Sequence, residues 1–263
     1  MKAELSKERY WMTRAGRAAT LLLAVTMAGP LSVSPSKAAS NPEQAPTDSA
    51  GAPAPHSRPP GKGLQATSMT RTDYGVAVVQ YWSLGPRLRA EAVVSGHNVV
   101  TVVNGAFYYA YDSLEGRGYR IRRSRAAIEA DGERLRPFGL QLQEILAEGG
   151  EKIREETFEG IPVDVYRVTD DEGRRTLRVP TGDPNQIPIS LETYNRSRGH
   201  TVRLDWINWL TGMNVPESFF MPPPNVELEE FESYDDYRIR LAEGGPIPPA
   251  LPFFKDLLVS PGE

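Results

Sequence analysis

The chain has 263 residues, a net charge of −4 and no cysteine. The lack of thiols excludes disulfide frameworks, thiolate metal sites and cysteine nucleophiles. A moderately acidic chain is also a poor match to nucleic acid, so we expect no nucleic-acid partner.

The first 39 residues have the pattern of a secretory signal peptide. Five basic residues between Lys2 and Arg17 precede an apolar run at residues 18–29, and small residues follow at Ala38 and Ala39. The run is shorter than the roughly 20 residues that span a bilayer. Removing the segment takes away six basic and two acidic groups, so the charge falls from −4 to −8. We expect an exported, periplasmic protein, or one tethered by the uncleaved segment.

Residues 40–63 are rich in Pro, Ala, Ser and Gly and have almost no large apolar side chain, which predicts a disordered linker. The pattern changes at residue 64 to short strands with tight turns between them. We expect strands at residues 76–84 and 87–94, then a hairpin within residues 97–112, then a strand at 119–123.

The hairpin is the strongest local signal. Runs of β-branched and aromatic residues flank Asn104-Gly105, a dipeptide typical of type I′ turns. With these two residues at the tip, Val102 pairs with Phe107. One face then carries Val100, Val102, Phe107, Tyr109 and Tyr111. The other face is also largely apolar, although an antiparallel sheet with one wet face would be polar there. We therefore expect both faces to be covered.

Two helices are expected after these strands. Ser124 can cap a helix at residues 125–131, and Pro137 suits the first turn of a second helix at 138–150. Phe138, Leu142, Ile145 and Leu146 form one apolar side of the second helix at helical spacing. This helix is the expected cover of the hairpin.

Strands resume at residues 152–159, 161–169, 174–180, 187–195, 200–209 and 226–231, and residues 216–221 suggest one helical turn. We predict a mainly β (α+β) fold: a strongly curved antiparallel sheet, an open half-barrel of about eleven strands, with helices on its concave face. The domain spans residues 64–232, and 233–263 form a C-terminal extension. Its proline-rich tail could pack as an arm or occupy a groove.

The search for catalytic chemistry is negative. The three histidines, His56, His97 and His200, lack metal-site spacing, and no nucleophile elbow, phosphate loop or dinucleotide motif is present. We expect no enzyme, no cofactor and no metal. Arg120 and Arg122 share one face of a strand. They form either a solvated face or a docking patch, since arginine suits phosphate and carboxylate groups.

Several segments resemble the LolA/LolB family of periplasmic lipoprotein carriers and its relatives. They are RLRAEAVV, VVNGAFYYAYD, FEGIPVDVYRVTDDEG, IPISLETYNRSRGHTVRLDW and VPESFFMPPPNVEL. The match covers residues 66–232. The resemblance implies an outer-membrane sorting or lipid-binding role, with Arg87 or Arg89 as a latch on the lid backbone.

We therefore expect a monomeric, non-enzymatic carrier or sensor whose cavity takes the acyl chains of a lipid or an acylated protein. Its lining would be the hairpin face Val100, Val102, Phe107, Tyr109 and Tyr111 together with Trp206, and its lid Leu142, Ile145 and Leu146. The alternative is an envelope interaction module with a filled core. The face that carries Arg120 and Arg122 would bind a partner protein, and a membrane protein is one candidate for that partner.

Overall fold

The computed structural model describes residues 62–72, 75–94, 96–243 and 254–259. The expected signal peptide lies outside these ranges, as do all but the last two residues of the expected linker. The expected fold class is confirmed, because the described residues form one curved, mainly antiparallel sheet that is not closed into a barrel. None of the helices in this part of the chain is long and apolar enough to cross a membrane.

The sheet has twelve strands, in the spatial order β12-β6-β5-β4-β3-β2-β1-β11-β10-β9-β8-β7. Neighbours are antiparallel except β12 and β6, which are parallel. The first six strands are β1 (Gly63–Thr72), β2 (Gly75–Leu84), β3 (Arg87–Val94), β4 (His97–Asn104), β5 (Phe107–Asp112) and β6 (Arg117–Arg122). The others are β7 (Glu151–Phe158), β8 (Ile161–Thr169), β9 (Gly173–Pro180), β10 (Ser190–Asn195), β11 (His200–Met213) and β12 (Glu227–Phe231).

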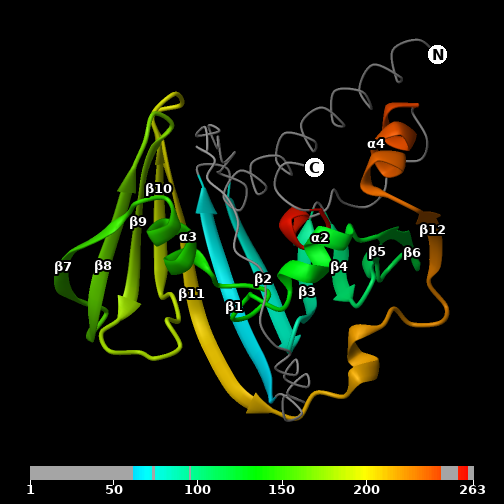
Figure 1. Cartoon of the computed structure of the whole chain (residues 1–263), viewed down its shortest axis with the longest axis horizontal. Coiled ribbons are helices and arrows are strands. Elements are labelled where there is room, and N and C mark those ends of the chain that lie inside the picture. The colour runs from blue at the N-terminus through cyan, green and yellow to red at the C-terminus, as the bar shows by residue number, and fades with distance from the viewer. Residues whose placement is uncertain (1–61, 73–74, 95, 244–253, 260–263) are drawn as a thin grey trace, which may run out of the picture.

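The strand missing from the expected count is β1, which joins the two halves of the sheet. It pairs with β2 on one side and with β11 on the other. Its sequence, GLQATSMTRT, is largely polar and gives little strand signal. The β1–β11 pairing shifts register between Thr67 and Ser68. Such a bulge bends and twists a sheet. Figure 1 shows the two halves of the sheet standing on either side of β1 and β2.

Helical segments lie between and after the strands. They are α2 (Arg125–Ala130), α3 (Gln141–Ala147), α4 (Tyr234–Ala242), η1 (Glu217–Phe220) and η2 (Lys255–Leu257). Ser124 caps α2 as expected, accepting a bond from the Ala127 amide at 3.2 Å. The helix expected at 138–150 is shorter, because Gly139 and Gly149 have φ values of 69° and 83°. Both lie in the left-handed region and bound α3 on either side.

The β4–β5 hairpin forms with a different loop. Asn104 pairs with Phe107 and Val102 with Tyr109, so Gly105 and Ala106 make the loop in place of Asn104-Gly105. Asn104 stays in the strand, and its side chain donates to the carbonyl oxygen of Phe220 at 3.1 Å. The pairing differs from the expected one by two residues. Since side chains alternate with a period of two, every one keeps its expected face.

Both faces of the hairpin are covered, as its pattern predicts. We call the face packed against α3, α4 and η2 the inner face; its core includes Tyr108, Tyr119, Ile145, Tyr237 and Leu257. We call the opposite face the outer face. Its smaller core consists of Val100, Val102, Tyr109, Tyr111 and Phe220, with partly buried residues of the segment 215–228 packed on it. In Figure 1, α3 lies by the half of the sheet that contains β8 and β9, which it contacts, and α2 lies by the other half.

The outer core predicts a specific stability effect. Phe220 is fully buried in it, so Phe220→Ala should lower the free energy of unfolding by about 3–5 kcal/mol through lost burial and a cavity. Urea denaturation measures this change. Leu114→Ala is the control, because Leu114 is 73% exposed, and it should change stability by less than about 0.5 kcal/mol. Equal, small effects of both changes would contradict the outer core.

Candidate functional site

The inner face contains a cavity of about 340 Å³. The sheet supplies its floor, and the segments around 134–144 and 254–256 supply its roof and rim. Ligand pockets measure about 300–1,000 Å³, so the cavity has the size of a small-molecule site. The sheet residues that line it are Thr70, Val79, Tyr81, Ala90, Ala92, Val99, Thr101, Leu204 and Trp206. The other lining residues are Arg134, Pro137, Phe138, Gly139, Leu140, Gln141, Glu144, Phe254 and Asp256.

One wall of the cavity is aromatic. Tyr81 stacks on Phe138 with ring centroids 5.0 Å apart, and Trp206 lies 5.2 Å from Tyr81. Trp209 extends the group, 4.8 Å from Trp206 and 5.6 Å from Phe138. Such rings bring large apolar area with few rotatable bonds. The wall is therefore rigid and suited to an apolar ligand.

The roof is fixed by a buried arginine. The Arg136 guanidinium donates to the carbonyl oxygens of Phe138, Asn185 and Gln186, at 3.0, 2.7 and 3.0 Å, and also to that of Gly139. It also lies over the Trp209 ring, 5.5 Å from the centroid. Burial lowers the pKa of this guanidinium. The bonds join the roof to the loop between β9 and β10.

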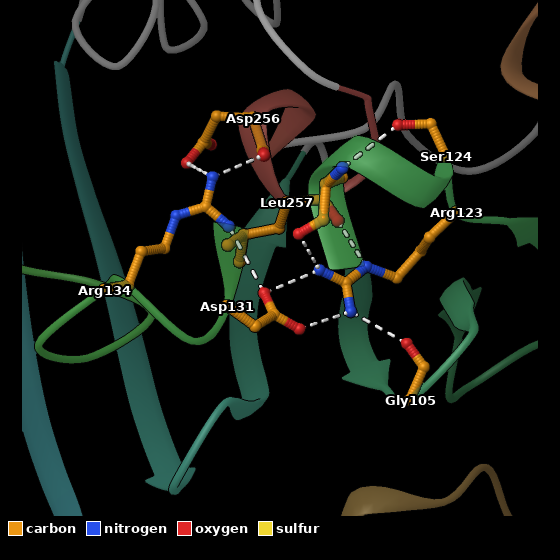
Figure 2. Close-up of polar contacts among 8 residues, drawn as sticks. Gly105, Arg123, Ser124, Asp131, Arg134, Asp256 and Leu257 are labelled. Carbon is orange, nitrogen blue, oxygen red and sulfur yellow. Dashed lines mark hydrogen bonds and ion pairs between the residues drawn. The ribbon is translucent and has the colours of Figure 1, made fainter. Parts of the chain in front are cut away.

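Arg134 and Asp256 of the cavity lining belong to a charged network, and Figure 2 shows its polar contacts. Arg123 is buried and forms a bidentate pair with Asp131, both bonds being 2.8 Å long. Arg134 donates to Asp131 at 3.3 Å and to the Asp256 carbonyl oxygen at 2.8 Å. Arg123 also donates to the carbonyl oxygens of Gly105, Ala127 and Leu257. The network thus ties the hairpin loop, α2 and η2 together.

Three lining residues carry buried polar atoms without a hydrogen-bond partner among the described residues. They are Thr101 Oγ1, Gln141 Oε1 and Trp206 Nε1. Buried polar atoms are nearly always bonded in folded proteins, because an unpaired one costs free energy. These three atoms have almost no solvent-accessible surface of their own, so a ligand or a water could bond them only after the wall shifts.

Of the residues expected to bind ligand, Trp206 lies in the cavity wall. Leu142 and Ile145 of the expected lid are buried in the inner core, whereas Leu146 is 46% exposed. Helix α3 contacts β8 and β9. Its contribution to the cavity comes from Gln141 and Glu144, which sequence reasoning missed.

The five hairpin residues expected to line a cavity lie on the face opposite the cavity described above. Val100, Val102, Phe107, Tyr109 and Tyr111 pack in the outer core and do not line the cavity. Their neighbours Val99 and Thr101 line it instead. The hairpin is apolar on both faces, so its sequence pattern indicates that each face is covered. The pattern does not indicate which cover leaves a cavity.

The two arginines expected to act as a latch contact the segment 215–228, which covers the outer face, and not the expected lid. Arg87 pairs with Glu217 at 3.0 Å. Arg89 donates to the Phe219 carbonyl oxygen at 3.1 Å and lies 4.6 Å from the centroid of that ring. The arginine that bonds backbone of the cavity roof is Arg136, which donates to carbonyl oxygens of the roof and of the loop between β9 and β10. It was missed because its partners are carbonyl oxygens, which the side-chain pattern does not reveal.

The arginines of the expected docking face are engaged within the chain. Arg120 contacts Glu230 at 2.5 Å, and Arg122 contacts Glu232 at 2.9 Å. Both guanidiniums also lie over the Phe107 ring. These contacts help to hold β12 and the residue after it beside β6.

A carboxylate lies beside His97, which the sequence pattern does not indicate. Asp112 Oδ2 lies 2.6 Å from His97 Nδ1, and Glu115 Oε1 lies 3.6 Å from the same nitrogen. Burial by itself would raise the pKa of Asp112, but bonds from His97 and from the Leu114 and Glu115 amides hold it below its usual value. The side-chain nitrogen and oxygen atoms of these three residues that could bind a metal ion lie within 4.8 Å of one another. The contact between His97 and Asp112 joins the start of β4 to the end of β5.

The phenol of Tyr81, in the cavity wall, makes the stability of the protein depend on pH in a measurable way. Burial raises the pKa of its phenol to about 12, although Ser68 donates to it at 3.2 Å. The unfolded phenol ionises near pH 10, so the unfolded state loses its proton first and stability falls as the pH rises above about 10. Tyr81→Phe should make that fall shallower by about 1.4 kcal/mol per pH unit between about pH 10 and 12. Urea denaturation against pH measures the slope, and an unchanged slope would contradict the burial.

No family model and no curated protein matches this chain. Among solved structures, a conserved protein of Thermus thermophilus has a TM-score of 0.47 and 12% identity, over 65% of this chain and 91% of that one. MucB of Pseudomonas aeruginosa, solved with MucA, has a TM-score of 0.40 and 14% identity, over 64% and 58%. A lipoprotein-sorting domain from Vibrio parahaemolyticus has a TM-score of 0.32 and 14% identity, over 60% and 89%.

Proposed function

We propose that the protein is an exported, non-enzymatic binding protein that takes one acyl chain or a similar apolar group into the inner-face cavity. The observation that carries the proposal is the cavity itself, apolar and aromatic on its floor and polar at its rim. Its export is supported by the signal-peptide pattern of the first 39 residues.

The energetics favour such a ligand. Each buried methylene group contributes about 0.8 kcal/mol, so a chain that fills the cavity can compete with its own aggregates or with a membrane surface. At about 340 Å³ the cavity is near the lower limit for ligand pockets. It suits one chain better than the several chains of a whole lipid.

The geometry also supports a carrier role over a merely structural void. A dry void would be lined by apolar groups alone. Here Thr101, Gln141 and Trp206 have buried polar atoms that lack partners among the described residues. The roof is irregular chain held by Arg136, and such a segment opens at lower cost than a strand within the sheet.

Tryptophan quenching tests the proposal and the assignment of the binding face together. The chain has four tryptophans; one variant keeps Trp206 in the cavity wall, and a second keeps Trp82 on the outer face, with the others changed to Phe. A brominated monoacylglycerol should quench Trp206 and leave Trp82 bright, because bromine quenches at contact. Displacement of Nile red verifies that each variant still binds.

Two results would contradict the proposal. Quenching of Trp82 but not of Trp206 would place the ligand on the outer face. Failure of the unaltered protein to bind either Nile red or the brominated lipid would remove the carrier role altogether.

A further inference from the structure

We propose that the cavity discriminates between lipid heads by charge: it accepts an uncharged or cationic head and rejects a carboxylate. This inference rests on the proposed function and adds the chemical class of the ligand. It follows from where the ionisable side chains lie and from which of them are already paired.

The lining divides into a buried end and an open rim. Ala90, Val99 and Trp206 are buried, as are most of the lining residues on the sheet. Glu144 is exposed, and the side chain of Asp256 is 57% exposed. An amphiphile therefore enters with its chain toward the sheet and leaves its head beside Glu144, Asp256 and Arg134.

The rim offers an anion no free cation. Arg134 is the cationic residue of the lining, and its guanidinium already contacts Asp131 at 3.3 Å and the Asp256 carboxylate at 3.6 Å. Asp131 in turn is held by Arg123. Arg175, on β9, is paired with Glu148. A bound carboxylate would thus meet engaged guanidiniums.

The rim carries one acidic side chain that lacks an ion pair. Glu144 makes no ion pair within 4.0 Å among the described residues, whereas Asp256 is paired with Arg134 at 3.6 Å. Burial and the neighbouring Asp256 raise the pKa of Glu144, and Arg175 lowers it. A carboxylate brought by a fatty acid would meet Glu144 without a free cation to offset the repulsion. At an effective dielectric constant near 20, like charges about 10 Å apart already cost roughly a tenfold loss in affinity.

Further inside, the available polar groups are uncharged. Thr101 Oγ1 and Trp206 Nε1 belong to residues that are more than nine-tenths buried, and neither atom has a partner among the described residues. A hydroxyl and an indole N–H can donate to a neutral or to a charged oxygen, and neither carries the positive charge that would neutralise a carboxylate. Discrimination by charge therefore depends on the rim.

Competition against bound Nile red tests the inference with the full protein at neutral pH. The competitors are laurate, monolauroylglycerol and dodecylammonium, which share one chain length and are used below their micelle concentrations. We expect the glycerol ester and the ammonium to displace the dye at concentrations about tenfold lower than laurate. Displacement by laurate at equal or lower concentration would overturn the inference and leave the cavity's function standing. If Nile red does not bind at all, both proposals fall.

A pair of variants separates charge from shape. Glu144→Gln removes a rim charge and keeps the size of the side chain. The ratio of the laurate concentration to the monolauroylglycerol concentration that displaces the same share of Nile red should therefore fall severalfold. Asp256→Asn should narrow it in the same direction. Glu133→Gln is the matched control, since Glu133 is exposed and does not line the cavity, and it should keep the ratio. An unchanged ratio in both rim variants would overturn the charge argument.

Discussion

The fold depends on one constraint: the β4–β5 hairpin is apolar on both faces and must be covered twice. Val102 and Tyr109 face one way, and Val103 and Tyr108 face the other, yet all four are buried. A sheet covered on one side would leave half of this area in water, at a cost of roughly 1.5–3 kcal/mol for each large side chain. The rest of the chain is arranged to provide the two covers.

The two covers differ in completeness. On the outer face, the segment 215–228 places Phe220 in the middle of a small core, where it is fully buried. On the inner face, helices and the C-terminal residues pack at either side and leave the cavity between them. Ala90 and Ala92 of β3 line that gap. Their small side chains leave the space that larger residues would fill.

Arginine donors attach both covers to the sheet. Irregular segments carry carbonyl oxygens that no neighbouring strand satisfies, and a guanidinium supplies several donors at once. Arg89 bonds the outer cover through Phe219, Arg123 bonds η2 through Leu257, and Arg136 bonds the roof to the loop that contains Asn185.

The sequence predicts what has a local cause. The antiparallel strands, the Ser124 cap and the two covered faces follow from periodicity and turn residues. Strand β1 was missed because its buried positions include Gln65, Ser68 and Thr70, which a hydrophobic pattern does not mark. The sequence does not predict which hairpin face borders the cavity, because Val99 and Val100 are alike in sequence and differ only in what covers them.

The C-terminal residues show how far the covers depend on distant parts of the chain. Leu257 and Leu258 are buried in the inner core, and the Phe254 amide donates to Tyr108 of β5 at 3.4 Å. Phe254 and Asp256 also line the cavity, so the same short segment completes the core and sets part of the rim. Charge at the rim is therefore coupled to the packing of η2, through the bonds of Arg134 and Arg123 to that segment. A ligand head that disturbs this charge balance would act on the attachment of the inner cover as well as on its own binding.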